Sequence, residues 1–386
     1  MTGSACVLTF IIYAVNFLPQ TIEFNGYTDT IAHISFAKNL FAGNAPRACY
    51  TYPLFYALVA CLGELFKDYS LAATVVIGLS AAATCYLQIR VLRYFLKDTC
   101  CNGKITLYGF ALSFIWPWNF AGYNITTLYL LSGATAPVHN ATYLFAKPFA
   151  LTCFFLYYLL IDSLPGQPPC PKATARKQNR ILVIFSILFL LSVLAKPNFY
   201  QIFAPAGALI AVICWLYYGN RVFLFCCKLA MAFVPATAWV LMNMDGTISL
   251  RYSPLEGYHI YNSTPLVPAI AQSLVFVIFV AVSGYVFRKN GRMLLTGLTV
   301  WVVGALEFFL WVQNGEEGSL NLMWGYLCAQ YLLFCIAVIC FEKMKPLFKG
   351  NLYYFGQFLF WGHFAMGLYA FASSSYTNWS LLLAQI

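Results

Sequence analysis

Charged residues are scarce in this sequence. Asp, Glu, Lys and Arg make up 9% of its 386 residues, whereas a soluble globular protein carries about 25%. Hydrophobic residues make up 61%, and no stretch is long enough or polar enough to form a separate soluble domain. The composition excludes a water-soluble protein. It predicts a polytopic membrane protein with a single transmembrane domain over residues 1–386.

Common nucleotide-binding and hydrolase motifs are also missing. The sequence has no Walker loop, Rossmann glycine pattern, HExxH or GxSxG in a credible context. Its 14 cysteines include no CxxC pair, and most lie inside apolar runs, where cysteine behaves as a small hydrophobic residue. We therefore expect neither a soluble nucleotide cofactor nor a cysteine-based metal site. A group donor would arrive through the membrane.

Basic residues outnumber acidic ones, 22 to 12, which gives a net charge of +10. Most of them lie in a few short segments, at residues 90–104, 172–180, 221, 288–292 and 343–349. Short basic loops are typical of the cytoplasmic side of a membrane protein. The positive charge therefore indicates orientation in the membrane, and we expect no nucleic-acid partner.

Eleven apolar runs predict an all-α fold with about 11 transmembrane helices. A span needs roughly 20 residues, and several of the runs are shorter. The first run lacks the basic segment and cleavage site of a signal peptide, so we interpret it as a retained span. The runs are Cys6–Leu18, Leu71–Leu96, Ile105–Asn119, Tyr143–Leu164, Ile181–Ala195, Phe199–Tyr218, Val222–Met242, Leu266–Phe287, Met293–Val312, Leu322–Phe341 and Leu352–Ala372.

The run Tyr52–Phe66 decides the predicted topology. All the basic segments fall on one side of the membrane only if this run does not cross. With about 15 residues it is shorter than a span, and it is better explained as a helix on the membrane surface. We therefore predict a cytoplasmic N-terminus and an outer C-terminus. Residues 21–70 would form the first extracytoplasmic loop, with helices lying along the membrane.

Asp29 and His33 are the first candidate site residues. They lie four positions apart, so on a helix they share one face. A carboxylate at the lipid boundary is costly unless it is paired or functional, which makes Asp29 a candidate general base. Asp29 as a helix cap is the structural alternative. His33 is a candidate substrate contact, with simple packing as its alternative.

Lys147 and Lys196 both occur as Ala-Lys-Pro, each at the outer end of a predicted span. Cations on the outer side run against the positive-inside bias, so they indicate an anionic partner. A lipid-linked phosphate or diphosphate would supply the anion, and Arg251 is a third candidate for holding it. Snorkelling of each lysine to lipid headgroups is the alternative.

Aromatic and amide side chains gather on the predicted outer side. Sugars present CH faces and hydroxyl groups, and such a lining suits both. An aromatic belt at the membrane interface has the same composition, and Asn140-Ala-Thr also fits the glycan acceptor pattern. The residues are Trp116, Trp118, Asn119, Tyr123, Asn124, His139, Asn140, Tyr258, His259, Tyr261, Asn321 and Trp324.

Three further acids are candidates. Glu316 and Glu317, in Asn-Gly-Glu-Glu-Gly, would orient a sugar or an acceptor. Glu307 lies inside a predicted span, where an acid is a functional candidate by default. An ion pair between Glu307 and Lys228 is the structural alternative.

The first hundred residues resemble the integral-membrane GT-C glycosyltransferases. The shared features are a first span, an outer loop with the early acid Asp29, two surface helices and the segment Tyr52-Pro53-Leu54. Beyond these residues the resemblance covers architecture alone. The sequence departs from the family in having Leu54 in place of a second proline, no second acid directly beside Asp29 and no large C-terminal soluble domain.

The resemblance implies an inverting glycosyltransferase. It would move a sugar from a polyprenyl-phosphate carrier to a glycan, lipid or protein acceptor on the extracytoplasmic or lumenal side, surrounded by membrane lipids. Asp29 would act as the base, and Lys147, Lys196 and Arg251 would hold the donor phosphate. A divalent cation is the one cofactor left open. The alternatives are a transporter or flippase of lipid-linked glycans, and a noncatalytic subunit of a membrane glycan-assembly complex.

Overall fold

A computed structural model describes residues 1–22, 29–40, 42–118, 140–164, 172–243, 249–260, 265–314 and 321–384. Almost all of these residues are helical, which confirms the predicted all-α class for the described part of the chain. The helices are α1 (Thr2–Thr21), α2 (Thr30–Leu40), α3 (Ala48–Thr51), α4 (Leu54–Phe66), α5 (Tyr69–Leu96), α6 (Asn102–Ala111), α8 (Ala141–Asp162), α9 (Lys172–Ala195), α10 (Asn198–Tyr218), α11 (Phe223–Asn243), α12 (Glu256–His259), α13 (Leu266–Val286), α14 (Gly291–Leu310), α15 (Asn321–Met344) and α16 (Leu352–Leu383). Two short strands, β1 (Leu250–Tyr252) and β2 (Trp311–Gln313), pair antiparallel.

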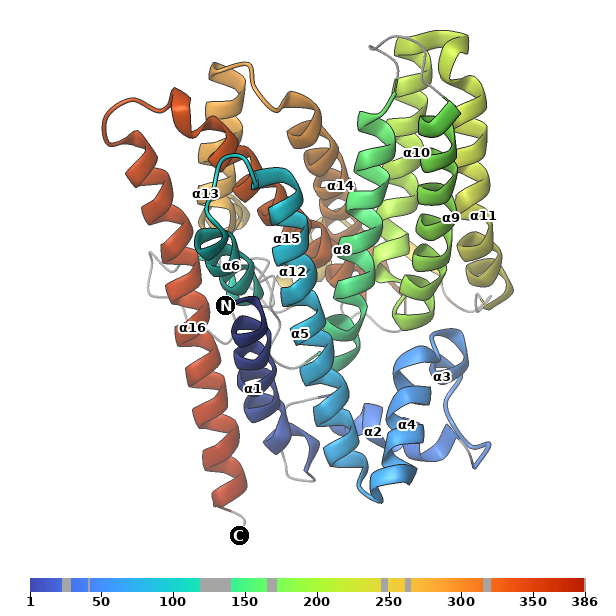
Figure 1. The fold of residues 1–386 in the computed structure, drawn as a ribbon. Helices are drawn as coiled ribbons and strands as arrows, with labels where there is room; N and C mark the ends of the chain where they lie inside the picture. The colour runs from blue at the N-terminus through green and yellow to red at the C-terminus, as the bar shows by residue number, and fades with distance from the viewer. Residues whose placement is uncertain are drawn as a thin grey trace.

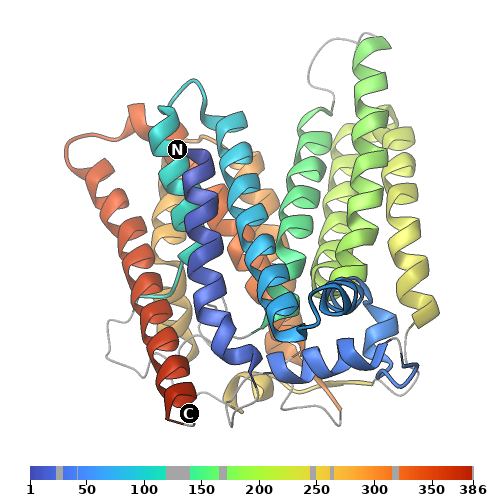
Figure 2. The same ribbon diagram turned by 60° about the horizontal axis from the view of Figure 1, so that its bottom comes forward.

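The long helices form an upright bundle with two different ends (Figure 1). The short helices α2, α3 and α4 gather at one end, which we call the first-loop end, and α2 lies across it (Figure 2). The α5–α6, α13–α14 and α15–α16 connections lie at the opposite end. These connections carry Lys97, Arg288 and Lys345 among other basic residues, and we call this end the basic end.

Eight helical stretches of the described residues are long and apolar enough to cross a membrane. The protein is therefore a multi-pass membrane protein, but the predicted count of about 11 is not confirmed. One stretch, Asn198–Asn243, contains both α10 and α11, which lie side by side in Figure 1. The others are Thr2–Thr21, Tyr69–Leu96, Ala141–Asp162, Arg176–Ala195, Leu266–Val286, Gly291–Leu310 and Asn321–Leu347.

The helix α15 is the centre of the bundle. Every residue from Leu322 to Glu342 is buried, whereas α1 and α9 bury only part of their surface. A helix that is hydrophobic on all sides is covered by other elements on all sides, and α5, α8, α10, α13 and α14 all contact α15. The remaining helices are therefore arranged around α15.

The predicted span Ile105–Asn119 is wrong as a continuous helix. Helix α6 ends at Ala111, and after one 3-10 turn the chain is extended up to Trp118. Pro117 disfavours helical backbone at Trp116. The extended backbone finds other partners, because the Trp116 N–H donates to the His363 carbonyl (3.2 Å) and the Trp118 N–H donates to the Gln272 carbonyl (3.1 Å). Irregular backbone is tolerated at membrane depth when protein surrounds it in this way.

Two glycines of α16 make room for this extended segment. A Cβ at Gly362 would lie 1.7 Å from the Trp118 ring, and one at Gly367 would lie 1.4 Å from the Phe114 carbonyl oxygen. No heavier residue fits either position without displacing the segment. The close approach of α16 to residues 114–118 therefore depends on both glycines.

A buried acid joins α6, α15 and α16 at the basic end. The side chain of Glu342 is 0% exposed, and Lys104 Nζ lies 2.9 Å from its carboxylate. Glu342 also accepts hydrogen bonds from the Tyr108 and Tyr353 hydroxyls, at 2.5 and 2.8 Å, and from Gln357 Nε2 at 3.1 Å. A buried charge is tolerated when it is paired and its remaining lone pairs are satisfied, as they are here.

We predict that Gly367→Ala destabilises the protein while Gly291→Ala does not. The added Cβ at position 367 would meet backbone, so no rotamer change relieves the clash, and overpacking of this kind costs about 1–3 kcal/mol or more. At position 291 the Cβ meets nothing within 4 Å. Thermal unfolding in detergent should show a drop of several degrees for Gly367→Ala alone. Equal melting temperatures for both variants would contradict the close approach.

Candidate functional site

Asp29 and His33 meet at the start of α2. The His33 N–H donates to the Asp29 carbonyl (3.0 Å), so Asp29 begins the helix. His33 Nε2 lies 3.5 Å from Asp29 Oδ2, and the Asp29 side chain is 41% exposed. The carboxylate is therefore held by a neighbouring ring and still open to a second molecule.

Tyr56 of α4 fixes the His33 ring from its other side. The Tyr56 hydroxyl lies 2.9 Å from His33 Nδ1. Burial raises the pKa of Tyr56 well above its ordinary value, so the hydroxyl keeps its proton and can donate it to Nδ1. This favours the tautomer in which Nε2 carries the hydrogen and faces Asp29. The order Tyr56–His33–Asp29 orients the carboxylate.

Asn140 joins this acid to a cation. It precedes α8 and caps that helix by accepting a hydrogen bond from the Tyr143 N–H at 2.7 Å. Its Nδ2 donates to Asp29 Oδ2 (3.3 Å), and its Oδ1 accepts a hydrogen bond from Lys196 Nζ (3.0 Å). One amide therefore places Asp29 and Lys196 on its two sides, and we call these three residues the bridged site.

Lys196 lies in the connection between α9 and α10 and is only 8% exposed. Its amine donates to Thr142 Oγ1 (2.9 Å) and lies 5.1 Å from the centre of the Trp324 ring. Burial lowers the pKa of Lys196 to about 8, and the charge of Asp29 opposes this shift. The amine is therefore still largely charged at neutral pH, in a site with little water.

Lys147 reaches the same face of α15 from the second turn of α8. It is 2% exposed, and its amine lies 4.1 Å from the centre of the Tyr331 ring. Trp324 and Tyr331 are seven residues apart, which is two helical turns on one face. Lys196 and Lys147 therefore lie along one side of the central helix, Lys196 near the first-loop end and Lys147 further into the bundle.

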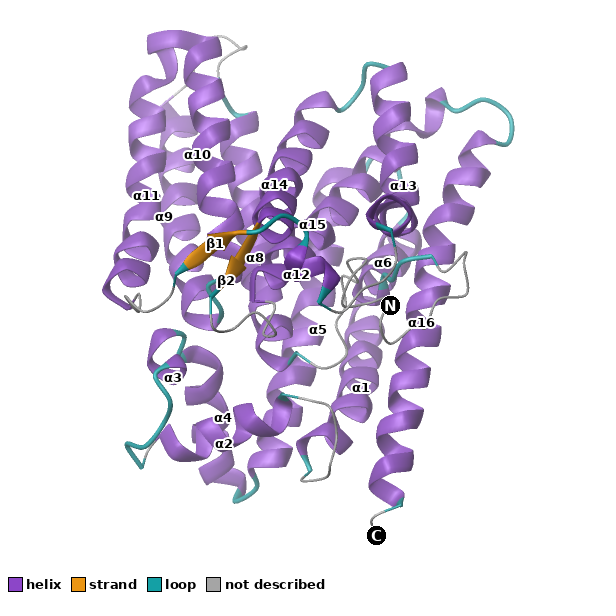
Figure 3. Cartoon of the chain, turned by 180° about the vertical axis from the view of Figure 1, so that it is seen from behind, coloured by secondary structure: helices purple, strands orange, loops and turns teal. Residues whose placement is uncertain are grey.

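Arg251 and His259 belong to a different surface group. Arg251, in β1, donates to Glu256 (2.8 Å) and Asn314 (3.2 Å), and the hydrogen bond from Arg251 lowers the pKa of Glu256. His259 is exposed at the end of α12. Figure 3 shows β1, β2 and α12 close together on the side of the bundle seen from behind. The contacts of Arg251 thus do not include the bridged site.

The other predicted residues divide into two groups. His139, Glu316 and Glu317 lie outside the described residues. Glu307 is near the first-loop end of α14, whereas Lys228 is near the opposite end of α11 and contacts Asn179 at 3.4 Å. The proposed pairing of Glu307 with Lys228 is therefore wrong. Among the residues that the structure describes, no group of three or more His, Cys, Asp or Glu is placed to hold a metal ion.

The sequence reveals only part of the bridged site. It singles out Asp29, His33 and Lys196, but it places Asn140 only in a sugar lining and does not identify Tyr56 or Thr142. One signal for Asn140 is present, because an amide directly before an apolar run is a common helix start. That start would put Asn140 at the same end as Lys196.

Comparison with known proteins does not assign the chain to a family. No protein-family model matches the sequence, and a search of curated proteins gives no match. The functional interpretation therefore rests on the chemistry of the residues around Asp29.

We predict that Lys196 makes stability rise with pH between about 8 and 10.5. Its native pKa is about 8 and its ordinary value 10.5, so between these values the unfolded chain binds more protons than the native protein. The free energy of unfolding then increases with pH over this window. Lys196→Met should lack that increase when melting temperatures of the two proteins are compared from pH 7.5 to 10. A constant difference between them would contradict the shifted pKa.

Proposed function

We propose that this protein is a membrane glycosyltransferase of the GT-C type. It would transfer a sugar from a polyprenyl-phosphate carrier to a glycan, lipid or protein acceptor at the first-loop end of the bundle. The observation that supports this function best is the bridged site, in which Asn140 contacts both Asp29 and Lys196. An accessible carboxylate and a buried cation side by side match the two charges that glycosyl transfer requires.

The proposed reaction is a single displacement. Asp29 takes the proton of an acceptor hydroxyl, and that oxygen forms a bond to the anomeric carbon of the sugar. The bond between this carbon and the donor phosphate breaks, and the phosphate leaves with the electron pair. Lys196 stabilises the charge that develops on the phosphate. Attack opposite to the leaving group inverts the anomeric configuration.

Lys147 extends the cationic side of this site. A polyprenyl carrier has an apolar tail and one or two phosphates, so its headgroup has to reach a cation from the lipid phase. Lys196 and Lys147 are both buried against rings of α15. A diphosphate lying along this face would contact both amines, whereas a monophosphate would contact Lys196 alone.

Orientation in the membrane follows from the two ends of the bundle. Basic connections mark the cytoplasmic side, so the N-terminus would be cytoplasmic and the bridged site would face the extracytoplasmic or lumenal side. The surface helices α2 and α4 would then rest on the outer leaflet. About 11 segments would cross the membrane if α10, α11 and α16 cross separately and α6 continues to the other side.

We predict opposite kinetic effects of Asp29→Asn and Lys196→Gln. Asparagine keeps the size of Asp29 but takes no proton, so the transfer rate should fall about 10²–10⁴-fold while donor binding is kept. Loss of a charge-assisted contact is worth roughly 1.5–3 kcal/mol, so Lys196→Gln should weaken donor binding about tenfold or more. Transfer and binding are measured with purified protein and a panel of polyprenyl-phosphate sugars.

The controls for this pair carry the same changes at the same end. Asp68 caps α5 by accepting a hydrogen bond from the Leu71 N–H, and Lys67 is an exposed residue paired with Glu64. Asp68→Asn and Lys67→Gln should leave both the rate and donor binding unchanged. Near-normal transfer by folded Asp29→Asn would remove Asp29 from the chemistry.

We predict that a cysteine at Glu64 is accessible from the outside of intact cells. Glu64 lies in α4, and its side chain is 55% exposed. In a background without the exposed Cys61, Cys101 and Cys227, Glu64→Cys should react with an impermeant thiol reagent before permeabilisation. Lys349→Cys, at the basic end, should react only afterwards. The reverse order would overturn the proposed orientation.

A further inference from the structure

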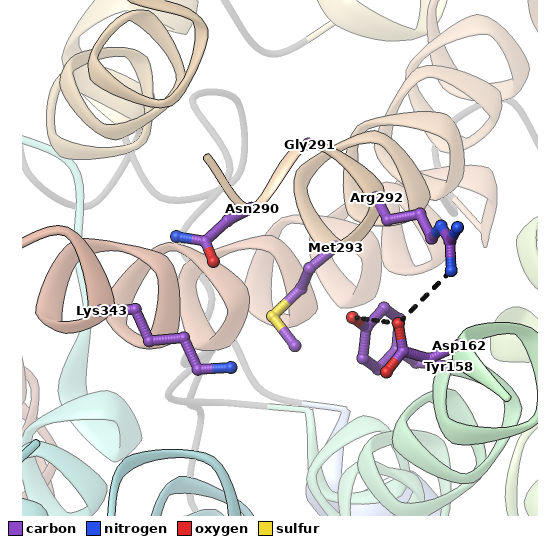
Figure 4. Close-up of a pocket in the computed structure, with 7 residues that line it drawn as sticks. All are labelled: Tyr158, Asp162, Asn290, Gly291, Arg292, Met293 and Lys343. Atoms are coloured by element: carbon purple, nitrogen blue, oxygen red, sulfur yellow. Dashed lines mark hydrogen bonds and ion pairs between the residues drawn. The ribbon is translucent and has the colours of Figure 1, made fainter. Parts of the chain in front are cut away.

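A small cavity opens at the basic end, between α8, α14 and α15. Its volume is about 270 Å³. Tyr158 and Asp162 line it from the end of α8, Asn290, Gly291, Arg292 and Met293 line it from the start of α14, and Lys343 lines it from α15 (Figure 4). The cavity lies at the opposite end of the bundle from the bridged site, and the proposed transfer reaction does not use it.

The charges that line this cavity are unequal. Arg292 and Lys343 are basic, and Asp162 is the single acid among the lining residues. Asp162 accepts a hydrogen bond from the Tyr158 hydroxyl at 3.3 Å and lies 3.9 Å from Arg292 Nη1. Lys343 instead lies over the Phe95 ring, 5.2 Å from its centre. One positive charge therefore remains uncompensated by the acid in the lining.

The start of α14 adds further hydrogen-bond donors. Asn290 precedes this helix and makes no side-chain cap. Its amide Nδ2 donates instead to the Cys340 carbonyl (3.3 Å). Gly291, Arg292 and Met293 form the first turn of α14 and line the cavity, and the N–H groups of a first helical turn favour an anion.

We propose that this cavity binds a phosphate group, carried by an anionic lipid headgroup or free in solution. The lining combines a guanidinium, an ammonium and a helix start, which are the usual donors to phosphate. Sites for drug-sized ligands measure about 300–1,000 Å³, so this cavity suits one headgroup rather than a nucleotide. Basic pockets between transmembrane helices bind lipid headgroups at the membrane surface.

Gly291 offers a way to close the cavity without changing its charge. A Cβ at this position meets nothing within 4 Å, so a larger side chain has space to enter. Gly291→Phe should fill the mouth of the cavity and leave Arg292 and Lys343 in place. This variant separates a built site from general attraction to a basic surface.

The test is binding of phosphatidylglycerol and phosphatidylcholine to the purified full-length protein, followed by native mass spectrometry. We expect the wild type to prefer phosphatidylglycerol about tenfold or more. Arg292→Gln/Lys343→Gln and Gly291→Phe should each lose most of that preference. Lys289→Gln/Lys349→Gln removes the same charge at the same end but does not alter the lining, and it should bind like the wild type.

Inorganic phosphate distinguishes the two sources of the ligand. A rise in melting temperature with phosphate alone, absent in Gly291→Phe, would assign the cavity to free phosphate. Lipid preference without that rise would assign it to a headgroup. Two results would overturn the proposal. One is a wild type that neither prefers phosphatidylglycerol nor responds to phosphate, and the other is a Gly291→Phe protein that binds both as the wild type does.

Discussion

The complete burial of α15 is the constraint on which the rest of the structure depends. No water reaches this helix between Leu322 and Glu342, so every charge beside it must find its partner within the protein. Near the first-loop end the partners of Lys196 and Lys147 are aromatic rings on α15, and at the basic end Lys104 is paired with Glu342. The central helix thus receives a cation at each of its ends, and the helices that carry these cations are fixed around it.

The helices were predictable from the sequence because each is a long apolar run, and the basic residues predicted which connections share an end. The break after Ala111 was not. Pro117 was visible, but the carbonyl groups that accept from Trp116 and Trp118 belong to His363 and Gln272, which are far away in the sequence. The central position of α15 was hidden for a similar reason, since a run that faces lipid and a run that faces protein are equally apolar.

The candidate site divides along the same line. Asp29 and His33 were predictable because helical spacing brings residues four apart together, and Lys196 stood out as a cation on the unexpected side. Asn140 acquires its importance from two partners in distant parts of the chain, Asp29 and Lys196, and no local pattern reports such a bridge. Arg251 was misplaced because its loop folds back onto Glu256 and Asn314. Its charge is used there.

The extended segment after α6 has a consequence for biogenesis. Trp116 and Trp118 are synthesised long before α16, yet the Trp116 N–H and the Trp118 indole donate to carbonyl groups of that helix. Until α16 emerges from the ribosome, these polar groups have no final acceptor in the nascent chain. The translocon or the water at its mouth therefore has to shelter the segment during elongation, and insertion of the α16 hairpin becomes the step that commits the whole bundle to its membrane-embedded form.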